Sequence, residues 1–205
     1  MYLAPVSLYV HLYAAEKMLA DLDAPFVKQT LRNRTLIAAE NGALPLTVPV
    51  VHSGGVKQAM RDVRISDHGN WRRMHWNALV SAYKKSPFFD YYADDFRPFY
   101  EKHCEFLADF NLRLHETVCN LLGLSRKVVT LGSVEYSAPI KDVRPLAEPS
   151  TISAVAPQHY YQVFQQRNGF LPNMSIADLL FNMGPEGLIT LRDAAKMLND
   201  ENIKL

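Results

Sequence analysis

Apolar residues recur along the chain with two periods, one typical of β-strands and the other typical of α-helices. Stretches with the pattern of a β-strand lie at residues 2–7, 31–39, 44–51, 63–66, 127–131 and 159–164. Asn41-Gly42 joins the second run to the third and is a strong local signal for a β-hairpin. Pro5 ends the first run, because proline has no N–H to extend a strand ladder. The pattern predicts a small sheet that includes an N-terminal strand and a hairpin.

Apolar positions spaced three and four residues apart predict several helices. These lie at residues 8–22, 71–85, 98–122, 176–182 and 185–198. Ser7 is placed to cap the first of them, and either Asn173 or Ser175 can cap the fourth. The longest carries a continuous apolar stripe, accepts Pro98 in its first turn and ends at Gly123. We therefore expect one long amphipathic helix in the middle of the chain.

One stretch of the chain, residues 137–157, has no periodicity and contains four prolines. Such a composition predicts a long irregular loop or a partly ordered lid. Strands and helices elsewhere mix without a regular alternation and without an internal repeat. The fold class is therefore expected to be α+β, a single domain over residues 1–205 in which a small sheet packs against several helices.

Composition places the chain among ordinary globular proteins and limits its partners. Its 205 residues are 48% hydrophobic and 21% charged, which is enough apolar material for one domain with a sizeable core. The 22 Lys and Arg against 21 Asp and Glu give a formal net charge of +1. No overall positive field exists to attract nucleic acid, so we expect none as a partner.

Neither a targeting segment nor a membrane span is expected. The apolar N-terminus lacks preceding basic residues, and no run approaches the roughly 18 apolar residues of a transmembrane helix. Cys104 and Cys119 fall on the predicted helix 98–122, about 22 Å apart, which excludes a disulfide between them. We therefore expect a cytoplasmic protein without membrane insertion.

Standard cofactor and metal motifs are absent from the sequence. It has no phosphate-binding glycine loop, no dinucleotide fingerprint, no nucleophile elbow and no pair of His or Cys residues at metal-ligand spacing. The seven histidines are scattered along the chain. We expect no cofactor and no bound metal, so any chemistry must come from local groups of polar and aromatic residues.

The first such group is basic and lies just ahead of the hairpin. Strand-like alternation would place Lys28, Arg32 and Arg34 on one face. Asn33 would point to the opposite face. Arginine binds carboxylates and phosphates through two parallel hydrogen bonds, so this row can hold an anionic ligand. The alternative is a solvated strand face, or ion pairing with neighbouring aspartates.

The second group combines both tryptophans with a histidine on the predicted helix 71–85. Trp71 and His75 share one face of this helix. Trp76 and Tyr83 share another. Flat aromatic faces beside Arg and Asn suit a sugar ring or a nucleobase, and His75 is the best general-base candidate because imidazole titrates near neutral pH. The alternative is a helix buried all round, with His75 as a hydrogen-bonded core residue.

The third group lies on the predicted helix 176–182. Asp178 and Asn182 are one turn apart, so their side chains project from the same face. A carboxylate beside an amide can orient a hydroxyl or an amine for reaction. It can equally tie the helix to a neighbouring arginine, and the spacing does not choose between these roles.

Taken in this order, the three groups resemble the WbqC-like protein family of bacteria. The matching pieces are Lys28 with residues 32–34, then residues 47–50, 65–66, 71–77, 81–83, 87–89, 91–92, 161–164 and 175–185. In one departure, Leu3-Ala4 precede Pro5, where many relatives carry a His-Gln pair. The chain is similar in this respect to the variants of Bacteroides-type bacteria.

The resemblance implies a role in the biosynthesis of O-antigen or other surface polysaccharides. The role proposed for such relatives is modification of an amino sugar, by transfer of an acyl or aminoacyl group. The resemblance also supports, as site residues, Arg32, Asn33, Arg34, His75, Trp76, Tyr83, Asp178 and Asn182.

The first functional hypothesis is a transferase of surface-polysaccharide biosynthesis. In it the basic group holds a phosphate or carboxylate, Trp71 or Trp76 stacks on a ring, and His75 takes a proton from an attacking amine or hydroxyl with Asp178 as its orienter. The alternative is a non-catalytic binding or scaffold protein for nucleotide-linked sugars or for enzymes of glycan biosynthesis. Both hypotheses expect a small sugar or nucleotide-sugar ligand.

Overall fold

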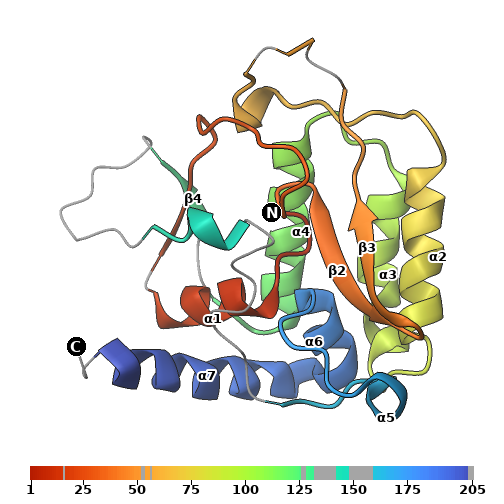
Figure 1. Cartoon of the computed structure of the whole chain (residues 1–205), viewed down its shortest axis with the longest axis vertical. Helices are drawn as coiled ribbons and strands as arrows, with labels where there is room; N and C mark the ends of the chain where they lie inside the picture. The colour runs from red at the N-terminus through yellow and green to blue at the C-terminus, as the bar shows by residue number, and fades with distance from the viewer. Residues whose placement is uncertain are drawn as a thin grey trace.

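The computed structural model describes residues 1–15, 17–51, 54–55, 57–125, 128–131, 142–147 and 159–202. Its helices and strands are α1 (Val6–Ala14), β1 (Met18–Ala20), β2 (Arg34–Ala39), β3 (Gly42–Thr47), η1 (Met60–Asp62), α2 (Trp71–Tyr83), α3 (Phe89–Glu101), α4 (Leu107–Leu121), β4 (Val128–Thr130), η2 (Arg144–Ala147), α5 (Gln165–Asn168), α6 (Ile176–Met183), η4 (Gly184–Glu186) and α7 (Gly187–Asn202) (Figure 1). The mixed α+β class predicted from the sequence is confirmed.

The predicted hairpin is present as β2 and β3. The two strands pair antiparallel, with Arg34 opposite Thr47 at the open end and Ala39 opposite Gly42 at the turn. Gly42 has φ 104°, a backbone conformation that side chains with a Cβ rarely adopt. The Asn-Gly turn therefore sets the register of the hairpin, as the sequence predicts.

A second sheet is made by β1 and β4, which pair in parallel with Met18 opposite Val128. The prediction of a strand from residues 127–131 is thus confirmed at Val128–Thr130. The N-terminal strand predicted at residues 2–7 is wrong, because Leu3 has φ 39° and breaks the extended backbone. Helix α1 begins directly after Pro5, earlier than the sequence predicts, and ends at Ala14.

The single long helix predicted at residues 98–122 is also wrong. Helix α3 ends at Glu101 with Pro98 in its last turn, and α4 begins only at Leu107. Between them the chain is extended and bonds to the neighbouring segment 63–65, where Leu107 N donates to the Val63 carbonyl at 2.9 Å. The apolar stripe therefore belongs to α4 alone. Gly123, with φ 68°, ends α4 as predicted.

Because α3 and α4 are separate helices, the two cysteines do not lie on one helix. Cys104 lies in the connection between α3 and α4, whereas Cys119 is buried on α4. Both thiols are free, as the sequence predicts.

The predictions for the later segments of the chain are confirmed in part. Helix α6 begins where predicted, and the Ser175 hydroxyl caps it by accepting from Ala177 N at 3.2 Å. The strand predicted at residues 159–164 is absent, because Gln162 fixes that segment through its side chain, which exchanges two hydrogen bonds of 2.9 Å with the backbone of Leu171. Most of the irregular stretch 137–157 lies outside the described residues, and its described part contains η2.

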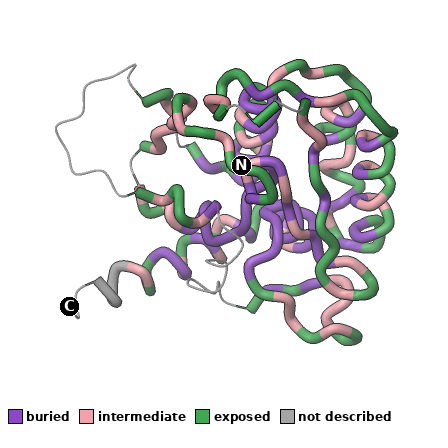
Figure 2. Tube along the Cα trace, turned by 45° about the horizontal axis from the view of Figure 1, so that its top comes forward, coloured by how far each residue is buried: buried purple, intermediate pink, exposed green. Residues whose placement is uncertain are grey.

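The core is built around α6, whose residues are almost all buried. Figure 2 shows the buried positions gathered at the centre of the molecule, and α7 runs alongside α1 at its border (Figure 1). The Phe181 ring of α6 lies about 5 Å from the rings of Tyr83, Phe89 and Phe96. One aromatic side chain thereby joins α2 and α3 to α6.

Removing this ring tests the central role of α6. We expect Phe181→Ala to lower the free energy of unfolding by about 3–5 kcal/mol, through lost burial and the cavity that remains. Tyr91→Ala is the matched control, since the Tyr91 side chain is 80% exposed, and it should stay within about 0.5 kcal/mol of the wild type. Urea unfolding measures both variants. A loss below about 1 kcal/mol for Phe181→Ala would contradict this account.

Candidate functional site

A cavity of about 160 Å³ lies between α1, the β1–β4 pair, α4, η1 and η2. Most of its wall is apolar and comes from Leu8, Met18, Leu19, Met60, Leu112, Val128 and several alanines. Five polar or charged side chains also line it, namely Asp21, Arg32, Asn111, His115 and Arg144. A concave apolar space with a few polar groups is the usual form of a small-molecule site.

Arg32 is fixed beside the cavity by α4. Asn111 Nδ2 donates to the Arg32 backbone carbonyl at 2.8 Å, and Arg32 Nη1 donates to the Thr30 hydroxyl at 3.2 Å. Asn111 is buried, and its Oδ1 atom accepts no hydrogen bond within the described residues. This part of the cavity wall thus combines the Arg32 guanidinium with a buried amide.

The remainder of the predicted basic row has a different arrangement. Residues 28–33 form turns, with Gln29 at φ 62°, so the strand alternation predicted for them is wrong. Lys28 is exposed on these turns, and Arg34 begins β2 with its Nε donating to the Thr47 hydroxyl at 3.1 Å. The Asn33 side chain is buried and donates to the Val48 carbonyl at 2.9 Å. Arg32 alone of these four lines the cavity.

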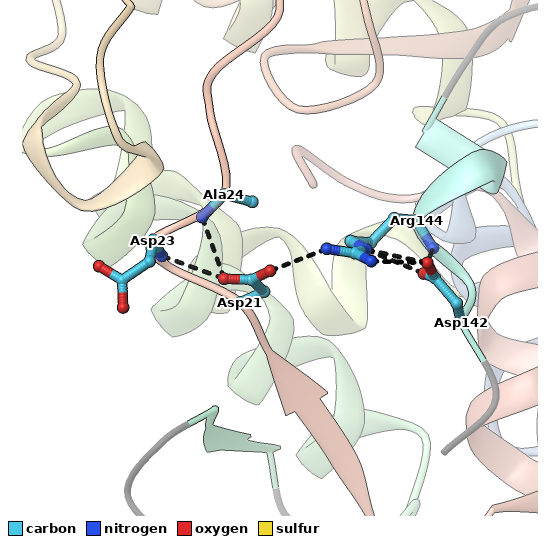
Figure 3. A network of polar contacts seen from close by, with 5 residues as sticks. All are labelled: Asp21, Asp23, Ala24, Asp142 and Arg144. Carbon is cyan, nitrogen blue, oxygen red and sulfur yellow. Dashed lines mark hydrogen bonds and ion pairs between the residues drawn. The ribbon is translucent and has the colours of Figure 1, made fainter.

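An ion-pair network borders the cavity where β1 ends (Figure 3). Arg144 Nη1 donates to Asp21 Oδ2 at 3.0 Å, and Arg144 Nη2 donates to Asp142 Oδ2 at 2.8 Å. The second oxygen of Asp21 accepts from the backbone N–H groups of Asp23 and Ala24. The network ties η2 to the end of β1. The neighbouring Arg144 guanidinium lowers the pKa of Asp142.

His115 is the cavity residue with the most obvious catalytic chemistry, but its ring is already engaged. Its Nδ1 lies 3.0 Å from the Tyr9 hydroxyl and its Nε2 lies 3.4 Å from the Cys119 sulfur. Burial lowers the pKa of His115 to about 4, and burial raises the pKa of the Cys119 thiol to about 12. Both groups are therefore neutral at pH 7.

His75 lies in the interior rather than on the cavity wall. Its side chain is 5% exposed, and its Nδ1 lies 3.0 Å from the Tyr2 hydroxyl, which in turn lies 2.9 Å from the Tyr100 hydroxyl. Burial lowers the pKa of His75 to about 4, and a hydrogen bond from the ring to the backbone of Thr47 opposes this shift only in part. At neutral pH the ring is uncharged and hydrogen-bonded.

Asp178 lies in a second buried network, at the other end of α2. Its Oδ2 atom accepts from the Tyr160 hydroxyl and from Gln162 Nε2, each at 2.7 Å. Asn182 Nδ2 donates to Oδ1 at 3.2 Å, so the two side chains share one face of α6 as predicted. Burial raises the pKa of Asp178 to about 6, although these donors and the Tyr83 hydroxyl act to lower it.

The structure therefore distributes the predicted site residues over separate places. His75 and Tyr83 are eight residues apart on α2, about 12 Å along the helix, and each belongs to its own network. The Trp71 indole donates to the Ser66 carbonyl at 3.1 Å, and the Trp76 ring packs near Phe89. None of these side chains is among the residues that line the described cavity.

The sequence analysis missed the cavity residues other than Arg32. Asn111, His115 and the apolar Ala108 and Leu112 come from one face of α4, at spacings of three and four residues. Two polar residues on a face that is otherwise apolar are a signal that could have indicated a site. Arg144 carries no such signal, because its position depends on an ion pair with the distant Asp21.

Comparison with known proteins places this mixed α+β chain in a family. Residues 2–144 match the WbqC-like protein family, and the chain belongs to it. It is also similar to the uncharacterized protein Rv1507c of Mycobacterium tuberculosis, with 31% identity over 198 residues that cover 83% of this chain and 85% of that protein. No solved structure matches the chain. Among the helices that the structure describes, none is long and apolar enough to cross a membrane.

The buried histidine gives a test by pH. An unfolded histidine has a pKa near 6.5, whereas that of His75 in the folded protein is about 4, so the unfolded state binds more protons between these values. Stability is then lost as the pH falls from about 6.5 to about 4, and His75 accounts for up to about 3 kcal/mol of that loss. We expect His75→Gln to flatten this part of the stability profile.

Urea unfolding at several pH values between 7 and 4 would measure the effect. The control is His68→Gln on an exposed loop, which should leave the slope as it is in the wild type. An equal acid slope in wild type and His75→Gln would show that His75 is not held in its neutral form by the fold.

Proposed function

We propose that this protein is a cytoplasmic transferase of surface-polysaccharide biosynthesis that modifies an amino sugar, with the acyl or aminoacyl group of the donor bound in the cavity beside Arg32. Membership of the WbqC-like family supports the biological setting. The observation that carries the proposal is the combination of apolar walls with the Arg32 guanidinium in one concave space.

The composition of the wall favours the donor group over the sugar as occupant. A sugar ring would place some of its hydroxyl groups against the apolar part of the wall, and each one left without a hydrogen-bond partner costs about 1–3 kcal/mol. An acyl group has an apolar body that suits the wall and a carbonyl or carboxylate oxygen that suits Arg32. The sugar then binds outside, where Asp21 and Arg144 offer charged groups at the edge of the cavity.

His75 and Asp178 are used in this proposal as positioning residues. The base role predicted for His75 stays a prediction, since the side chain is buried and bonded to Tyr2. Through Tyr2, His75 holds the N-terminal segment whose Met1 and Ala4 line the cavity. Asp178 holds α6 against its neighbours.

A second candidate function is a non-catalytic protein that binds nucleotide-linked sugars or enzymes of glycan synthesis. The observation that favours it is the neutral state of His115, which lines the cavity, and of Cys119, whose sulfur contacts the His115 ring. Neither group is placed to act as a nucleophile or a base.

A ligand screen with a matched pair of arginine variants tests the proposal. A ligand at about one hundred times its dissociation constant adds about 2.7 kcal/mol of stability, which a thermal-shift measurement detects. Acyl-coenzyme A compounds, aminoacyl donors and nucleotide sugars are the compounds to screen. We expect Arg32→Gln to weaken binding of the donor at least tenfold, and Arg34→Gln on the hairpin to leave it unchanged.

Transfer of the donor group to an amino sugar is then measured directly. Transfer that depends on Arg32 would support the transferase. Binding of nucleotide sugars without any transfer would support the second candidate. Equal effects of the two arginine variants would contradict the assignment of the cavity as the donor site.

A further inference from the structure

We infer that the cavity binds a short acyl group of about six carbon atoms, with its carboxylate or carbonyl oxygen at Arg32, and that side chains of α4 set this length limit. The inference rests on the proposed function for its place in a reaction. It names the chemical class of the donor group and the residues that select it.

The volume of the cavity sets the size of the occupant. A cavity of about 160 Å³ is close to an engineered cavity of about 150 Å³ that binds benzene, a molecule of six carbon atoms. A longer chain would extend beyond the apolar wall through the open side of the cavity, where further methylenes gain little burial. A much shorter chain would leave part of the apolar wall without contacts.

Small side chains create this space. Alanines from five parts of the chain line the cavity, namely Ala4, Ala20, Ala24, Ala108 and Ala147. Ala108 is buried on α4, one turn before Leu112, which also lines the cavity. Because residues i and i+4 lie on one face of a helix, these two side chains define one continuous part of the wall.

Arg32 supplies the polar end of the site. The Asn111–Arg32 bond of 2.8 Å holds the backbone of Arg32 against the same face of α4. The planar fork of a guanidinium matches the two oxygens of a carboxylate, and Arg32 is the residue of the basic row that lines the cavity. The ligand therefore lies with its oxygens at Arg32 and its alkyl part along Ala108 and Leu112.

A series of straight-chain carboxylates from acetate to decanoate tests the length limit by calorimetry with the wild-type protein. Each methylene that enters the apolar wall should tighten binding about fourfold, up to about hexanoate. Octanoate and decanoate should bind no more tightly than hexanoate. A continuous gain through decanoate, or no dependence on length, would overturn the inference.

Two variants of α4 should change the chain length that binds most tightly, in opposite directions. Ala108→Leu fills part of the cavity and should shift the tightest ligand to a chain shorter by about two carbons. Leu112→Ala enlarges the cavity and should shift it to a longer chain. Ala93→Leu on α3, which does not line the cavity, is the matched control and should bind like the wild type. An unchanged optimum in both α4 variants would overturn the assignment.

If Ala108→Leu unfolds, Ala20→Leu makes the same test from the opposite wall, since Ala20 lies on β1 and is only half-buried. The head group is tested with hexanol and hexylamine, which should bind at least tenfold more weakly than hexanoate. Equal binding of the three compounds would overturn the role given to Arg32.

These outcomes are separate from those of the proposed function. Length-dependent carboxylate binding without any transfer would refute the transferase and support the inference about the cavity. Transfer from an acyl donor without length-dependent binding would support the transferase and refute the inference.

Discussion

The buried carboxylate of Asp178 is the constraint on which the arrangement of the core depends. An ionised group without water needs a donor for each oxygen, and here the donors come from Tyr160, Gln162, Asn182 and Tyr83. Loss of one donor would leave a buried charge incompletely bonded, which costs more than the net value of a single hydrogen bond. The positions of α2, of α6 and of the chain ahead of α5 are therefore determined together. Helix α4, which contributes part of the cavity wall, packs against α6.

The elements that the sequence predicts well are those with local signals. The hairpin has its Asn-Gly turn, α6 has its Ser175 cap, and the end of α4 has Gly123 at a positive φ. The errors come from tertiary contacts that override a local pattern. The stripe of apolar residues gives no sign that the chain leaves the helix after Glu101, because the reason is pairing with the distant segment 63–65.

A residue of the candidate site can be predicted from the sequence only where its residue type and its near neighbours indicate the same role. Arg32 is identified by its residue type, although the strand geometry used to place it is wrong. His75 is a polar residue among aromatic side chains. The same description fits a catalytic base and a buried, hydrogen-bonded core residue. The alternative stated for it, a hydrogen-bonded residue in the core, describes its position in the structure. Arg144 depends on an ion pair across most of the chain, which no local pattern shows.

The parallel pairing of β1 with β4 has a consequence for the kinetics of ligand exchange. The two strands have three residues each and are distant in sequence, so few bonds repay the entropy of bringing them together. We therefore expect this wall to open more readily than the helical centre. Exchange of a ligand on this side of the cavity then depends on a short strand pair and on the Asp21–Arg144 ion pair, as well as on the contacts of the ligand itself.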